Sequence, residues 1–274
     1  RVLGAPLYEI IATLIHNIGG LKLVNLFSLL CWVLFALTVN KIFNLLSLQK
    51  NYLLKFFLIT HPIYLINSTI MMEFSLSFLL CAYLVYLYLK IIDTFKFLSI
   101  FYLIFLSLIS ILVRPDNLIF VFAIFLSLLS VKKVWENIQI INIYFFLIPL
   151  LICILSFFTF FDLTIFNINF FINEKIQNHI ARIFFGLFNV YGFFIFIIFF
   201  IFVFNIIKSK QIFIITNKLK NLFIVISILY LIRWILLPHE PEYLMPYFLV
   251  SIIFLLNYKN KKINFLLITS FILM

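Results

Sequence analysis

Charged residues are scarce in this chain of 274 residues: they make up 11% of the composition, while hydrophobic residues make up 66%. Soluble chains carry about 25% charged residues. With a mean hydropathy of +1.26, the chain has too much apolar surface to bury within a soluble domain, which excludes a soluble enzyme or binding module. We therefore predict an integral membrane protein.

Cysteine is also scarce, and Cys31, Cys81 and Cys153 all lie in apolar stretches. Their spacing fits neither a disulfide framework nor a metal site, so we expect them to pack as small hydrophobic residues and predict no bound metal. The alternating pattern of a membrane β-barrel is missing as well. Because backbone groups in lipid must be satisfied internally, a helical bundle is the architecture that remains.

Long apolar runs fill the space between the few charges. Most contain roughly 15 to 25 residues, close to the ~20 that an α-helix needs to cross a bilayer. The predicted fold class is all-α: a polytopic transmembrane helix bundle of about ten spans that forms a single domain over 1–274, with an exoplasmic interfacial helix over 1–20. The candidate spans are about 21–40, 56–72, 74–89, 97–113, 117–131, 138–161, 183–207, 221–237, 243–258 and 263 onward.

The charges between these runs are sorted by sign. Fourteen of the sixteen lysines fall in alternate connections, whereas all four arginines and seven of the nine acidic residues fall in the others. The positive-inside rule places the lysine-rich connections in the cytoplasm. The net charge of +11 is then a topology signal and implies no nucleic acid. We expect a multi-pass protein of a bacterial inner membrane, with any chemistry on its exoplasmic face.

Two segments in the first third of the chain have recognisable features. In APLYEIIATLIHNIGGLKLVNLFSLLCWVLFAL, Pro6 suits the first turn of a helix, and Gly19 with Gly20 permits the left-handed backbone that ends it. The interfacial helix of a transporter would look the same. In HPIYLINSTIMMEFSLSFLLCAYLVY, Glu73 lies in a turn between two spans, where it either faces a site or is solvated. His61 precedes the helix-breaking Pro62 and is expected to pack.

Two later segments place charges at the exoplasmic boundary. LVRPDNLIF holds Arg114 and Asp116 close together around Pro115, either as a phosphate site or as a pair that reaches interfacial water. In HEPEYLMPYFLVSIIFLL the prolines fix a turn from which His239 and two glutamates project. Arg233 precedes His239 at helical spacing, which makes this the most specific cluster in the sequence.

In their order and on this face, the four segments resemble those of GT-C type membrane glycosyltransferases, in the branch of protein O-mannosyltransferases and aminoarabinose transferases. The resemblance implies transfer of a sugar from a polyprenyl-phosphate donor to a hydroxyl of a glycan, lipid or protein acceptor. It implies that the donor phosphate contacts Arg114, Arg233 and His239, with Arg182 behind them. The other substrate-binding candidates are Glu73, Asp116, Glu240, Glu242 and Tyr243.

The sequence departs from this family at the general base. The family places an aspartate in the first exoplasmic loop, and no Asp precedes Asp93 here. We therefore expect the base, with at least one more helix, upstream of Arg1, and leave the catalytic residue unassigned. The resemblance implies no cofactor beyond the lipid-phosphate sugar donor and leaves a divalent cation open; membrane lipids are the remaining partner.

Three other classes of protein stay open at this point. A lipid-linked glycan flippase or other transporter would place ionisable groups near the midplane and show related halves. An O-antigen ligase or polymerase would carry its exoplasmic Arg and His in one large loop. A noncatalytic membrane subunit needs only charged helix ends as anchors.

Overall fold

The computed structural model describes residues 6–48, 52–69, 73–131, 178, 180–185, 219–236 and 244–257. Within these ranges the regular structure is helical, without a strand, which confirms the all-α prediction for this part of the chain. The helices are α1 (Pro6–Leu45), α2 (Tyr52–Ile59), α3 (Pro62–Thr69), α4 (Phe74–Asp93), α5 (Phe97–Val113), α6 (Asn117–Leu129), α11 (Lys220–Leu236) and α12 (Met245–Asn257).

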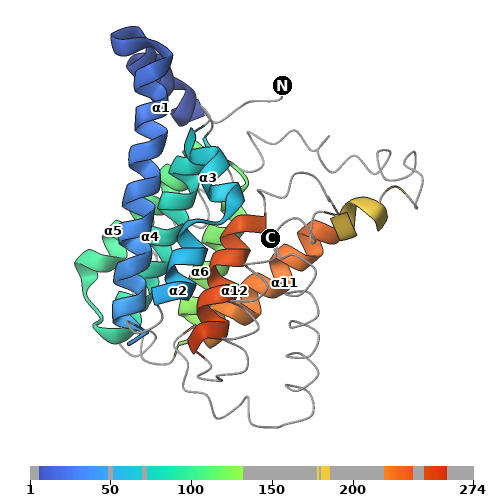
Figure 1. The fold of residues 1–274 in the computed structure, drawn as a ribbon. Helices are drawn as coiled ribbons and strands as arrows, with labels where there is room; N and C mark the ends of the chain where they lie inside the picture. The colour runs from blue at the N-terminus through green and yellow to red at the C-terminus, as the bar shows by residue number, and fades with distance from the viewer. Residues whose placement is uncertain are drawn as a thin grey trace.

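Helix α1 consists of two segments that meet at Gly20. Gly20 has φ 65° and ψ −165°, a backbone conformation that is accessible essentially to glycine alone. At Gly19 an added Cβ would lie 2.8 Å from Cβ of Leu23, so this position also has no room for a side chain. Figure 1 shows the first segment folding back beside the second at an end of α1 that projects beyond the other helices. The predicted helix start at Pro6 and helix end at the two glycines are confirmed.

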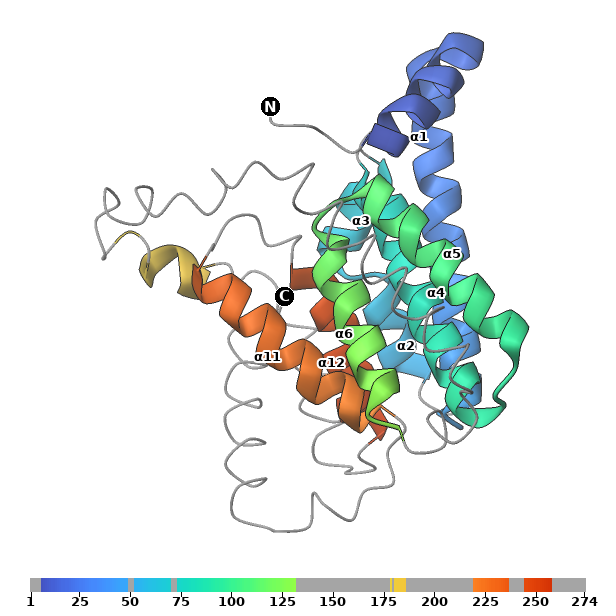
Figure 2. The same ribbon diagram turned by 180° about the vertical axis from the view of Figure 1, so that it is seen from behind.

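Helix α4 forms the centre of the bundle. It contacts α1, α3, α5, α6 and α12, and it contributes fully buried side chains such as Leu84 and Tyr88 to the core. Helix α11 packs against α6 and α12 on the other side, as Figures 1 and 2 show. Because the helices pack around α4, the ends of α4, α5, α6 and α11 lie close enough together to form one site.

Pro62 divides the span expected at 56–72 into two helices of eight residues each, α2 and α3. Proline has no N–H to continue the helix. Beyond it, the N–H of Ile63 donates to His61, and the carbonyl of Ile59 accepts a hydrogen bond from the indole of Trp32 (3.1 Å) in place of that N–H. The buried His61 accepts the N–H of Ile63 at its Nδ1 (3.3 Å) and lies against the ring of Phe248. His61 therefore packs, as predicted, and also caps the first turn of α3.

The number of membrane spans differs from the prediction. In the described residues two helices are long and apolar enough to cross a membrane, Leu7–Leu45 and Phe74–Asp93. The helices at 97–113, 117–129 and 245–257 occupy predicted positions but are shorter, and the run at 56–72 is broken by its proline. Ten full spans are thus not found in this part of the chain. The predicted spans 138–161 and 263 onward, and all but the first residues of 183–207, lie outside the described residues.

Candidate anion-binding site

A sharp corner between α5 and α6 supplies the first two charges of the site. Arg114 is extended (φ −148°, ψ 114°), because the following Pro115 disfavours helical backbone in the residue before it. Helix α6 then begins at Asn117, whose N–H donates to the carbonyl of Arg114 (3.0 Å). The corner therefore holds Arg114 and Asp116 within two positions of each other at the helix ends.

Arg114 is fixed on two sides although it carries a charge. Its Nη2 donates to Oδ2 of Asp116 at 2.9 Å, and its guanidinium carbon lies 3.8 Å from the centre of the Phe74 ring. The arginine side chain is 7% exposed. A guanidinium that stacks on an aromatic ring and bonds a carboxylate is held in one orientation.

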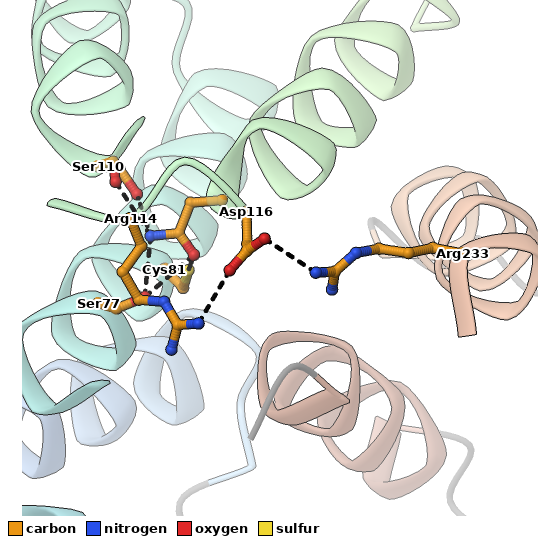
Figure 3. A network of polar contacts seen from close by, with 7 residues as sticks. Ser77, Cys81, Ser110, Arg114, Asp116 and Arg233 are labelled. Carbon is orange, nitrogen blue, oxygen red and sulfur yellow. Dashed lines mark hydrogen bonds and ion pairs between the residues drawn. The ribbon is translucent and has the colours of Figure 1, made fainter. Parts of the chain in front are cut away.

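Arg233 completes the cluster from a distant part of the sequence. It lies in the last turn of α11, and its Nη2 donates to Oδ1 of Asp116 at 2.9 Å across a separation of 117 residues. Figure 3 shows the two guanidiniums approaching the carboxylate from opposite sides. Asp116 thus accepts one N–H from each arginine, one at each of its oxygens.

These charges line a small, partly open hollow with room for about one water molecule. Its wall combines polar and apolar groups from α4, the α5–α6 corner, α11 and α12. The lining residues are Ser77, Phe78, Arg114, Asp116, Asn117, Tyr230, Arg233 and Pro246. A small anionic group near its mouth would meet two guanidiniums that are already oriented, which is the arrangement that favours phosphate or carboxylate ligands.

Asn117 anchors the floor of the site, and the sequence analysis did not single it out. Its buried amide Nδ2 lies 2.8 Å from Oγ of Ser77 on α4 and 3.0 Å from Oγ of Ser110 on α5. One side chain, adjacent to Asp116 in the sequence, therefore connects three helices (Figure 3 shows Ser77 and Ser110 beside the charged cluster). The signal that could have revealed it is a lone amide in the first turn of an otherwise apolar helix, with a serine in each preceding helix.

The other predicted site residues are placed less closely or lie outside the described part. Glu73 immediately precedes Phe74, the residue on which Arg114 stacks, and is half-buried. Arg182 is exposed in the helical stretch 180–185, where the carbonyl of Ile183 accepts the indole N–H of Trp234 (3.2 Å) next to Arg233. His239, Glu240, Glu242 and Tyr243 lie outside the described residues.

Three of the predicted residues, Arg114, Asp116 and Arg233, are therefore brought into direct contact. Their role as substrate ligands stays a prediction. The described ranges contain no group of three or more His, Cys, Asp or Glu side chains that could hold a metal ion.

In the described ranges, the fold and site together define a helical bundle with an Arg–Asp–Arg cluster at one end. Comparisons of the chain with protein-family models, with curated proteins and with solved structures find no match.

Proposed function

We propose that this protein is a multi-pass membrane protein whose described helices lie side by side in the bilayer. Large apolar side chains are exposed along whole helices: Leu26, Leu30, Leu34 and Leu37 on α1, Phe101 and Phe105 on α5, and Ile224, Ile228 and Ile232 on α11. Soluble monomers rarely expose contiguous apolar patches larger than a few hundred Å². Such rows of exposed apolar side chains are stable in the hydrocarbon interior of a bilayer.

The positions of the cations support a defined orientation. Lys41 of α1 and Lys90 of α4 lie 6.0 Å and 5.9 Å from the ring centre of the same Tyr86. The other end of α4 carries Phe74, which contacts Arg114, and twenty helical residues separate its two ends by about 30 Å. We assign the lysine end to the cytoplasm and the arginine end to the exoplasmic face.

At the exoplasmic end we propose a glycosyltransferase of the GT-C type that uses a polyprenyl-phosphate sugar. The observation that carries this proposal is the convergence of Arg114 and Arg233, from helices far apart in the sequence, on one point at the bundle end. A lipid-linked donor would keep its tail along the apolar helix surface and its phosphate beside the two guanidiniums. His239 is a third candidate for this phosphate.

The reaction requires charge stabilisation that the cluster can supply. The acceptor hydroxyl attacks the anomeric carbon, a carboxylate takes its proton, and the bond between that carbon and the phosphate oxygen breaks. Negative charge then develops on the leaving lipid phosphate. Guanidiniums oriented before the reaction stabilise this charge without reorganising, which is where such sites gain most of their rate.

Substitution of Arg233 tests the proposal. Arg233→Ala should lower transfer by about 10² to 10³, the usual loss for one contact to developing charge. Arg233→Lys keeps the charge but loses the planar donors, so it should be intermediate. The measurement is transfer of labelled sugar from a polyprenyl-phosphate donor in membranes that contain the full-length gene product at matched expression.

The matched control is Lys220→Ala, because Lys220 lies on α11 like Arg233 but at its opposite end. It removes one cation from the same helix and should leave transfer near normal. Normal transfer by Arg233→Ala would reduce the cluster to a clamp between α6 and α11, which fits a noncatalytic membrane subunit. A wild-type protein that transfers no sugar would refute the enzymatic proposal itself.

A further inference from the structure

Asp116 occupies the space between the two cations of the site. Its two oxygens each lie 2.9 Å from a guanidinium nitrogen, and its side chain is 27% exposed, against 7% for Arg114 and 18% for Arg233. Asp116 is therefore the most accessible of the three charges. A ligand that approaches the arginines must also approach this carboxylate.

Phosphate ligands differ in the charge that they bring to such a site. A phosphodiester, such as a lipid-phosphate sugar, carries one negative charge. A phosphomonoester, such as the lipid phosphate left after the sugar has gone, has a second pKa near 6 and carries about −1.5 to −2 at pH 7. The second charge is the chemical difference between the donor and its product.

We infer that Asp116 is a specificity-determining residue that lowers the affinity of the site for doubly charged phosphomonoesters relative to singly charged phosphodiesters. This inference rests on the proposed function for the identity of the ligand as a phosphate. The carboxylate neutralises part of the field of both arginines and repels further negative charge. At a largely buried site such repulsion is poorly screened by solvent.

The selection has a consequence for turnover. Cleavage of the sugar–phosphate bond converts a diester into a monoester, whose second charge Asp116 repels, at the same place. Asp116 therefore weakens the binding of the lipid-phosphate product relative to the next donor. The two arginines alone would favour the product, because it offers more charge to the same donors.

Binding of two matched probes tests this inference without a reaction. The probes are a short isoprenyl monophosphate and its methyl phosphodiester, titrated against the purified full-length protein in nanodiscs of zwitterionic lipid. The variants are wild type, Asp116→Asn, which keeps the shape of the side chain, and Asp93→Asn. Asp93 is the last residue of α4, at the opposite end of the bundle, so its substitution changes the net charge equally and serves as the control.

At pH 7.5 Asp116→Asn should raise the affinity for the monoester relative to the diester by about tenfold, while Asp93→Asn leaves this ratio unchanged. The difference between the two proteins should also depend on pH. At pH 5, where both probes carry one charge, the affinity for the monoester relative to the diester should be nearly the same in wild type and in Asp116→Asn. Since both probes meet the same protein, titration of protein groups contributes little to the ratio.

An equal loss of affinity for both probes in Asp116→Asn would overturn the inference and leave Asp116 as a group that orients the arginines. If that variant does not fold, a wild-type affinity for the monoester, relative to the diester, that rises tenfold or more from pH 5 to pH 7.5 overturns it equally. Binding of neither probe to wild type removes the anion site, and with it both proposals. If the binding ratios are as expected but the protein transfers no sugar, the inferred specificity of the site stands and the proposed transferase activity is refuted.

Discussion

The cations at the two ends of the bundle are held in different ways. At the corner between α5 and α6, Arg114 and Arg233 share one carboxylate at 2.9 Å, and Arg114 is buried. At the other end Lys41 is exposed and lies 6.0 Å from the ring centre of Tyr86, while Lys55 donates to Oδ1 of Asn40 at 2.8 Å.

The difference shows what each kind of cation contributes. A flexible lysine near a tyrosine ring can reach water and lipid headgroups, and it needs no fixed geometry to orient a membrane protein. An arginine held by a ring and a carboxylate has lost its freedom before a ligand arrives, which suits recognition. In the proposed function, the same sign of charge therefore serves topology at one end and binding at the other.

The largest expected effect concerns the proposed placement of the two ends on opposite sides of a membrane. In a variant without native cysteines, His16→Cys, exposed in the first segment of α1, should react with an impermeant thiol reagent in intact cells. Lys96→Cys, exposed between α4 and α5, should react only after permeabilisation. The readout is all-or-none labelling on a gel. Labelling of both positions from one side would abolish the contrast between a cytoplasmic and an exoplasmic end.

A smaller effect should follow from removal of the amide below the charged corner. Asn117→Leu has a similar size but leaves the hydroxyls of Ser77 and Ser110 without their shared partner. The expected cost is about 1 to 3 kcal/mol of stability, measured as a lower apparent Tm in detergent.

The matched control for Asn117→Leu is Ser127→Ala, a buried position on the same helix. The hydroxyl of Ser127 donates to the carbonyl of Ala123 one turn earlier in α6, so its loss removes a hydrogen bond within one helix and not between helices. A Tm that falls equally in both variants would mean that Asn117 does not hold the three helices together.

The smallest effect is expected at the lysine end. Lys90→Gln removes a half-exposed cation that lies 5.9 Å from the ring centre of Tyr86. Its loss should cost at most about 1 kcal/mol, and the apparent Tm in detergent should shift by less than in Asn117→Leu. A larger shift for Lys90→Gln would make the lysine end a structural site as well.

Several boundaries of the fold follow from local chemistry and were predictable. Helix α5 begins after Lys96 and ends before the Arg114–Pro115 pair, at the predicted 97–113. The ends of the first helix segment follow from Pro6 and from Gly20, whose φ of 65° other residues rarely adopt. The break at Pro62 was expected as a kink, but the partner of the freed carbonyl, Trp32, was not.

The site was predictable only up to the end of the bundle on which its residues lie. Counting apolar runs places Arg114, Asp116 and Arg233 at the same end. Successive helices are expected to run in opposite directions, and each of these residues lies where a helix ends or begins on that side of the bundle. It does not specify that one carboxylate bridges both arginines, or that Asn117 contacts Ser77 and Ser110.

In the part of the chain that the structure describes, the sequence by itself determined the helical class, several helix ends and the sorting of lysines from arginines, since these depend on neighbouring residues and on where charges interrupt the apolar runs. The tertiary structure decided which helices touch. A helix that is apolar all round carries no stripe to mark its packed face, so the contact between α11 and the α5–α6 corner depends on how side chains from distant segments fit together. The Arg–Asp–Arg cluster exists because that fit brings Arg233 to Asp116.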